Sequence, residues 1–313
     1  MLNVEIVIHN ELARFIALKR EPSAPSEKLL RFVERSAEAS VEKLLLVALD
    51  GDAVEKQHHT VCRVFRRPVV RGILVCGRVA VELPYLPEKL LGVGENEVFV
   101  CSTGVIGQKL PVEKVLDGVR QIIPAKLDKD NGSDAAYAIM TTDTHPKEIA
   151  LEFAVGGKAV RIGAIAKGSG MIHPNMATML LFMTTDAKVA PAALQKALST
   201  VVPATFNQIS VDGDTSTNDT VLLLASGLSG AEIAEGTPDY DTFVAALTEV
   251  AEHLSRELAG DGEGATKLLE CTVTGAPNLA TARAVSKSVI HSTLFKACLL
   301  YTSPSPRDLS TSR

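Results

Sequence analysis

Three absences from this 313-residue sequence exclude large classes of protein. Its apolar runs are strand-length, far shorter than the roughly 20 residues that a membrane-spanning helix needs. The first residues, Met-Leu-Asn-Val-Glu-Ile, are not a basic segment ahead of a long apolar stretch, so we expect no secretory signal peptide. Positive charge is not in excess, since 37 acidic residues face 32 basic ones, and we expect neither nucleic acid nor a membrane as a partner.

Paired cysteines are missing too. The five cysteines are odd in number and no two are spaced C-x-x-C, which favours reduced thiols and a cytoplasmic protein. Cys101 ends an apolar run and is predicted to be a packed thiol rather than a nucleophile. No segment has zinc-ligand spacing, a Walker loop or a G-x-G-x-x-G loop, so we expect no metal and no bound cofactor.

What is present is a hydrophobic content of 46% with 22% charged residues, ordinary for a globular enzyme. Segments 148–155 and 158–166 alternate across Gly156-Gly157, which predicts a two-residue hairpin. Further strands are predicted at 97–101, 137–142, 178–183, 220–225 and 267–273, and helices at 111–123, 191–202 and 240–258. This order predicts an α+β fold of layered sheets and helices.

The most informative segment is a glycine loop that runs from Lys167 to a small residue, Ala177, and then to Thr178 at the start of a predicted strand. A threonine with its own free α-amine supplies both the nucleophile and the base, because that amine has a pKa of about 8 and accepts the hydroxyl proton. The amine is free only after the Ala177–Thr178 bond is broken, and attack of the Thr178 hydroxyl on the preceding carbonyl would break it. A glycine-rich loop followed by a buried strand is the alternative interpretation.

Three other polar turns accompany this loop. Ser102-Thr103-Gly104 follows a predicted strand, where one hydroxyl and one backbone N–H suffice for an oxyanion hole. Residues 211–219 lack the glycine and glutamate positions of an EF-hand loop, so we interpret them as a hydrogen-bonded polar loop beside the site rather than a metal site. Glu263 lies between two glycines, either in an ordinary turn or where a carboxylate meets a substrate amine.

Taken together, the motifs resemble the ornithine acetyltransferase family, the glutamate N-acetyltransferases of cyclic arginine biosynthesis. The resemblance covers residues 91–293. Six motifs occur in the family's order: Cys101-Ser-Thr-Gly-Val-Ile-Gly, Met140-Thr-Thr-Asp-Thr, Lys167-Gly-Ser-Gly-Met-Ile, Asn175-Met-Ala-Thr-Met-Leu, Val211-Asp-Gly-Asp-Thr-Ser-Thr-Asn-Asp and Gly262-Glu-Gly-Ala-Thr-Lys.

The resemblance implies an autocatalytic cut between Ala177 and Thr178. It implies Thr178 as the acyl-carrying nucleophile, with Thr103 and Gly104 forming the oxyanion hole. Acetylornithine would acylate the threonine, ornithine would leave, and glutamate would take the acetyl group. Acetyl-CoA as a further donor is left open. The residues that would contact substrate are Thr141 or Thr142, Lys167 and Glu263.

The resemblance also implies that the two chains made by the cut stay together, as a heterotetramer of two of each. Residues 1–177 correspond to the α-chain, of which 1–90 match the family poorly, and 178–297 correspond to a truncated β-chain. The family's Asn-Trp-Gly-Arg segment is absent, since the sequence has no tryptophan. Residues 298–313 resemble a translated sequencing adapter and are predicted to be a non-native tail.

Two other interpretations remain. An amino-terminal-nucleophile amidohydrolase or aminopeptidase would use the same cut and nucleophile with water as the acceptor. A fragment that never cleaves itself would have no catalysis at all. Transfer of the acetyl group to glutamate would distinguish the predicted enzyme from the hydrolase. Absence of cleavage would identify the inactive fragment.

Overall fold

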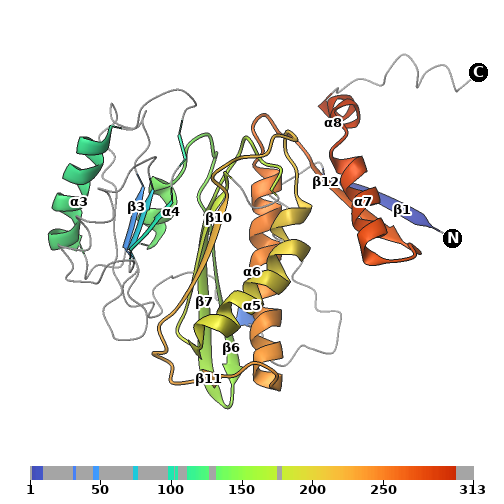
Figure 1. Ribbon diagram of the computed structural model, residues 1–313. Coiled ribbons are helices and arrows are strands. Elements are labelled where there is room, and N and C mark those ends of the chain that lie inside the picture. The colour runs from blue at the N-terminus through green and yellow to red at the C-terminus, as the bar shows by residue number, and fades with distance from the viewer. Residues whose placement is uncertain are drawn as a thin grey trace, which may run out of the picture.

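The computed structural model describes residues 2–9, 31–32, 45–48, 73–76, 98–101, 103–104, 111–126, 132–174 and 178–300. At its centre is a five-stranded sheet in the order β10–β8–β7–β6–β2 (Figure 1). The strands are β2 (Arg31–Phe32), β6 (Lys147–Val155), β7 (Lys158–Lys167), β8 (Leu180–Thr185) and β10 (Thr220–Ala225). β10 runs parallel to β8, and the remaining neighbours are antiparallel.

The predicted hairpin is confirmed as β6 and β7. Its turn has Gly156 at φ 54° and Gly157 at φ 78°. Two successive residues at positive φ match the right-handed twist of paired strands, and glycine adopts this conformation without a Cβ clash. The turn therefore sets the register of the two strands, from Val155↔Lys158 to Lys147↔Ala166, and Lys167 follows as the last residue of β7.

Strand β8 is buried on both faces, which explains its continuous apolar sequence. Leu181 and Met183 point into the main hydrophobic core. Leu180 and Phe182 point to the opposite face and pack in a second, smaller core. β8 is thus the central strand on which both layers of the protein rest.

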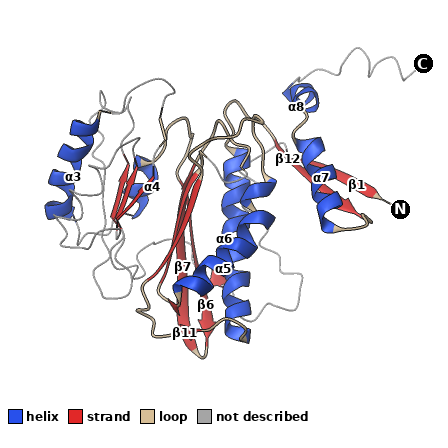
Figure 2. Ribbon diagram, in the orientation of Figure 1, coloured by secondary structure: helices blue, strands red, loops and turns tan. Residues whose placement is uncertain are grey.

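Two helices, α5 (Pro191–Val201) and α6 (Pro238–Gly260), cover the first face of the sheet (Figure 2). α6 begins where Thr237 caps the backbone N–H of Tyr240, with proline at the first helical position. Its buried side chains recur at helical spacing, from Phe243 through Leu247, Val250 and Leu254. Both helices confirm the sequence prediction.

The second face carries α4 (Gly132–Ala138), and beyond it lie α3 (Val112–Lys126) and the parallel sheet β3–β4–β5 (Figure 1). The strands of this sheet are β3 (Leu45–Ala48), β4 (Ile73–Cys76) and β5 (Val98–Cys101). The predicted strand at 137–142 is wrong, because helix α4 and a turn occupy this segment. Ala135, Ala136 and Ile139 are buried with helical spacing, while Tyr137 is 61% exposed.

A third unit lies on the side of α6 away from the sheet (Figure 1). It pairs β1 (Asn3–His9) antiparallel with β12 (Leu268–Thr274) and continues into α7 (Leu279–Ile290) and α8 (Thr293–Leu300). The short elements are β9 (Lys188–Val189), β11 (Glu232–Ile233), η2 (Val202–Ala204) and η3 (Phe206–Gln208). These layers confirm the α+β class. Within the described ranges, none of the helices combines the length and apolarity that a membrane crossing requires.

Candidate functional site

Four strand ends meet at one edge of the central sheet. Lys167 at the end of β7 pairs with Leu180 at the start of β8, and Thr220 at the start of β10 pairs with the same residue from the other side. Cys101, the last residue of β5, packs against Leu180 and Phe182. Sequence segments that carry the motifs therefore converge here, although Cys101 and Thr220 are 119 positions apart in the sequence.

Lys167 joins three of the predicted site residues. Its side chain is buried, and its ammonium donates to Thr141 Oγ1 at 2.7 Å and to Thr103 Oγ1 at 3.5 Å. Because an ammonium only donates, both hydroxyls act as acceptors here and keep their own protons for another group. The structure brings Thr141 to Lys167. Thr141 and Thr142 are both exposed in the same bend, and Gly104 is exposed beside Thr103.

Thr178 has a buried hydroxyl, and its Oγ1 has no hydrogen-bond partner in the part of the chain that the structure describes. The backbone directly after it is held firmly: Met179 N donates to Asp219 Oδ1 at 2.7 Å, and Thr220 N donates to Met179 O at 2.8 Å. Leaving a buried hydroxyl unpaired costs about 1–3 kcal/mol, so such a group calls for an explanation. Ala177 lies outside the described residues.

The polar loop at 211–219 contacts the glycine loop, as predicted. The Asp212 carboxylate accepts the backbone N–H of Met171 at 2.5 Å and of Ile172 at 3.1 Å. Met171 has φ 56°, which is unfavourable for a side chain of its size. Asp212 thus stabilises a strained turn, and Asp219 at the other end of the same loop holds the residue after Thr178.

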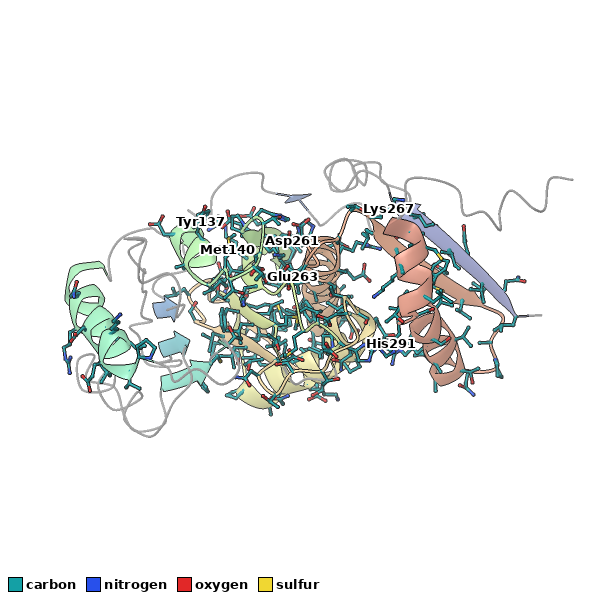
Figure 3. The ribbon with its side chains drawn as sticks, turned by 90° about the horizontal axis from the view of Figure 1, so that it is seen from above. Tyr137, Met140, Asp261, Glu263, Lys267 and His291 are labelled. Atoms are coloured by element: carbon teal, nitrogen blue, oxygen red, sulfur yellow. The ribbon has the colours of Figure 1, made fainter. Side chains whose placement is uncertain are left out.

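Glu263 contacts the glycine loop from the carboxyl-terminal side of α6. Its backbone N–H donates to Ser169 O at 2.9 Å. A Cβ built on Gly170 would lie 2.7 Å from Glu263 Oε2, so the carboxylate occupies the space that a side chain would need. Seen from above, Glu263, Asp261 and Met140 lie over the same end of the sheet (Figure 3).

Two glycines of this loop are expected to respond differently to alanine. At Gly168, with φ 148°, a Cβ would lie 2.9 Å from Ile172 Cδ1 and 3.6 Å from the Met179 Cα, so we expect a loss of about 2–3 kcal/mol. At Gly170 the one close neighbour of the new atom is the end of the exposed Glu263 side chain, with Asp212 Oδ2 at an ordinary contact distance of 3.9 Å. We therefore expect a loss below about 1 kcal/mol. Urea unfolding of Gly168→Ala and Gly170→Ala checks this, and equal losses would contradict the packing described.

Cys101 is a buried thiol, as predicted. Burial raises its pKa to about 11, although a hydrogen bond with Thr220 acts in the opposite direction. The thiolate fraction at neutral pH therefore falls about a hundredfold below that of an ordinary cysteine. We expect iodoacetamide to modify the exposed Cys298 in the folded protein and Cys101 only after unfolding, measured by peptide mass. Rapid alkylation of native Cys101 would show that this thiol is reactive.

A buried ionic cluster was missed by the sequence analysis. Lys147 Nζ lies 2.7 Å from Asp143 Oδ1 and 2.5 Å from Asp261 Oδ2, and all three side chains are at most 3% exposed. Burial acts to raise the pKa of Asp143, but Lys147 and the Gly168 N–H hold it below its usual value. The period-two pattern of β6 contained a signal, since Lys147 falls on the same face as the buried Ile149 and Leu151.

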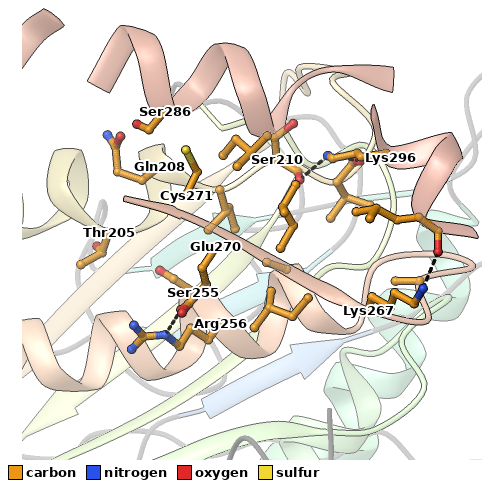
Figure 4. A pocket seen from close by; sticks show the side chains of 18 of the residues that line it. Thr205, Gln208, Ser210, Ser255, Arg256, Lys267, Glu270, Cys271, Ser286 and Lys296 are labelled. Atoms are coloured by element: carbon orange, nitrogen blue, oxygen red, sulfur yellow. Dashed lines mark hydrogen bonds and ion pairs between the residues drawn. The ribbon is translucent and has the colours of Figure 1, made fainter. Parts of the chain in front are cut away.

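A cavity of about 520 Å³ lies between α6, β12 and the α7–α8 segment (Figure 4). Glu263 is among its lining residues, but Thr103, Thr141, Lys167 and Thr178 are not. Its cations already bind protein acceptors: Arg256 pairs with Glu270 at 2.8 Å, Lys296 donates to Ser210 O at 2.8 Å, and Lys267 donates to Leu299 O at 2.7 Å. We therefore assign the chemistry to the strand-end site and not to this cavity.

Comparison with known proteins finds a family model, described as ArgJ family, that matches residues 79–305. Arginine biosynthesis bifunctional protein ArgJ from Lactococcus lactis is 53% identical over 212 residues, which are 67% of this chain and 52% of that protein. The protein of the same name from Symbiobacterium thermophilum is 52% identical over 223 residues, 71% of this chain and 55% of that one. The chain spans about half the length of the curated relatives it matches.

Two solved structures are also similar. One is arginine biosynthesis bifunctional protein argJ from Bacillus halodurans, at 40% identity over 38% of this chain and 56% of that chain, with a TM-score of 0.34. The other is ornithine acetyltransferase from Mycobacterium tuberculosis, complexed with ornithine, at 23% identity over 47% of this chain and 81% of that chain, with a TM-score of 0.27.

Proposed function

Because this chain belongs to the ArgJ family, as its motifs predicted, we propose that it transfers an acetyl group from N2-acetylornithine to glutamate after cutting itself before Thr178. One observation carries this proposal. The Thr178 hydroxyl is buried without a hydrogen-bond partner in the described part of the chain, at the strand edge where Lys167 meets Thr103 and Thr141. No hydrogen bond within the described residues has to break before this oxygen forms a bond to a carbonyl carbon.

The first reaction is the cut. The Thr178 Oγ attacks the Ala177 carbonyl carbon, the peptide C–N bond breaks, and the α-amine of Thr178 takes the proton, which leaves an ester. Water then hydrolyses that ester to a carboxylate on residue 177 and a free hydroxyl on Thr178. The Asp219 contact with Met179 N supports this step, because it fixes the backbone on one side of the attacking group.

The second reaction uses the new amine. It accepts the Oγ proton while Oγ attacks the acetyl carbon of acetylornithine, and ornithine leaves as its protonated amine. The amine of glutamate then attacks the acetyl ester, which forms acetylglutamate and restores the hydroxyl. The Thr103 hydroxyl and the Gly104 N–H are the proposed oxyanion donors. Since Lys167 donates to Thr103 Oγ1, the Thr103 proton is directed to another acceptor.

Several properties of the whole protein belong to the same proposal. The substrates are amino acids, contacted by Thr141, Lys167 and Glu263, and acetyl-CoA as a second donor is left open. Segments 1–177 and 178–297 act as the two chains of one enzyme, which assembles as two of each. We propose a cytoplasmic location, in keeping with the reduced cysteines.

Isotope transfer tests the proposal. Parent protein is incubated with acetylornithine labelled in the acetyl group, with and without glutamate, and the products are separated by mass. Labelled acetylglutamate supports the proposal. Labelled acetate that forms equally without glutamate identifies a hydrolase instead, and an uncut chain without either product overturns the proposed function.

A further inference from the structure

The buried cluster of Lys147, Asp143 and Asp261 has few properties of a stabilising device. Its two carboxylates share the Lys147 ammonium, and its side chains are at most 3% exposed. The Lys167 ammonium also acts on Asp143, and His145 Nδ1 lies 3.6 Å from Asp261 Oδ1. Apolar side chains of similar volume often give equal or greater stability, so burial of such a cluster is weak evidence for a stabilising role. The further contacts of its carboxylates point to another role.

Asp143 reaches the Lys167 side of the site. Its Oδ1 accepts the Gly168 N–H at 2.7 Å, directly after Lys167, and its Oδ2 accepts the Thr141 N–H at 3.1 Å. Lys167 Nζ in turn donates to Thr141 Oγ1 at 2.7 Å. One carboxylate therefore fixes the backbone on both sides of the Lys167–Thr141 contact.

Asp261 reaches the Glu263 side. It lies at the carboxyl-terminal end of α6, and its carbonyl accepts the Ser169 hydroxyl at 2.8 Å. The Ser169 carbonyl accepts the Glu263 N–H at 2.9 Å. The Asp261 carboxylate is itself anchored, because Oδ2 accepts the Thr144 N–H at 3.0 Å. Asp261 and Ser169 thus join the Glu263 turn to the loop that follows Lys167.

Lys147 connects the two halves, since its ammonium contacts both carboxylates. We infer that Lys147, Asp143 and Asp261 are positioning residues that hold the Lys167 ammonium and the Glu263 carboxylate at a fixed separation, matched to a ligand that carries a carboxylate and an amine. The inference rests on the proposed function and deepens it by naming the residues that position two of the proposed substrate contacts, Lys167 and Glu263. Charge-assisted hydrogen bonds at both ends give such a site its selectivity.

Two variants test the inference, one that removes the central charge of the cluster and one that removes a single neutral hydrogen bond. Lys147→Met removes the central ammonium, and Ser169→Ala removes only the hydroxyl link to Asp261 while leaving every ion pair intact. Lys188→Met is the control, because Lys188 forms an exposed pair with Glu232 far from the cluster in sequence and on a different sheet. For each chain we would measure binding of L-ornithine by calorimetry, self-cleavage by intact mass, and folding by circular dichroism.

The expected result is an ornithine Kd raised by about tenfold to a hundredfold in folded Lys147→Met and Ser169→Ala, with self-cleavage retained and the control unchanged. If Lys147→Met does not fold, Ser169→Ala alone decides. Unchanged affinity in a folded variant overturns the inference and leaves the proposed function standing. Parallel loss of cleavage and binding also overturns it, because the cluster would then support the fold generally. A parent chain that does not bind ornithine refutes the proposed function, and this inference with it.

Discussion

Thr178→Ala abolishes self-cleavage and lowers acetyl transfer by at least about 10⁴-fold, because it removes the only atom that the mechanism bonds to the acyl carbon. Intact mass of the variant then gives one species of 313 residues, where the parent gives two that correspond to residues 1–177 and 178–313. Fold stability should change little, since the Thr178 Oγ1 makes no hydrogen bond to the described residues.

Two matched variants make this result specific. Thr178→Ser keeps an oxygen at the same position and is expected to cleave, although more slowly. Thr200→Ala removes an exposed threonine on α5, whose hydroxyl donates to Lys196 O, and should cleave like the parent. Cleavage of Thr178→Ala at the same bond would disprove the role of this hydroxyl.

Lys147→Met destabilises the protein by about 3–5 kcal/mol at neutral pH, because it leaves the Asp143 and Asp261 carboxylates buried without their cation. The methionine side chain has nearly the length of lysine, so lost packing contributes little. Lys188→Met removes an exposed ion pair with Glu232 and should cost at most about 1 kcal/mol. Urea unfolding of the three proteins gives the comparison, and equal midpoints would refute the buried ion pairs.

The pH dependence of this loss has a definite sign. In the parent, the pKa of Asp143 lies below its usual value of 3.8, so its contribution is present above that pH and is lost as the pH falls through the folded pKa. Lys147→Met removes the largest contribution that opposes burial, while the Gly168 N–H and Lys167 remain. We therefore expect the pKa of Asp143 to move upward from its value in the parent, so that the stability lost by the variant shrinks as the pH falls. The difference in unfolding free energy between the parent and Lys147→Met should therefore become smaller as the pH falls from about 6 to about 3. A difference that widens towards acid would contradict the assignment.

The elements that the sequence predicted well are those whose signals are local. Gly156-Gly157 between two alternating segments specifies the hairpin, and the apolar stripe of α6 behind Thr237 and Pro238 specifies that helix. The motifs singled out Thr103, Thr141, Lys167 and Glu263 as candidates, and in the structure Lys167 contacts both threonines. Thr178 lies two residues before β8, and the sequence signal there was a glycine loop followed by an apolar run.

What the sequence did not predict depends on distant contacts. Residues 137–140 form a short apolar run like that of a strand, but Ile139 and Ala135 pack in one cluster with Leu180 and Phe182 of β8, and that contact favours a helix. Asp143 and Asp261 are 118 positions apart in the sequence, and only the fold shows that both bind Lys147. Ser169 is an ordinary loop serine in the sequence, and its link to Asp261 appears only when α6 is in place.

The strand pairing also predicts how the protein would behave after the proposed cut before Thr178. β7 and β8 come from opposite sides of the cut and pair along six residues of each strand, from Ile162↔Thr185 to Lys167↔Leu180, while β1 and β12 pair from Asn3↔Thr274 to His9↔Leu268. Neither product contains all the strands of the central sheet or both strands of the β1–β12 pair, so the two can separate only by unfolding. Unfolding of the cut protein is then a bimolecular equilibrium, and its melting temperature rises with protein concentration, whereas that of the uncut chain does not.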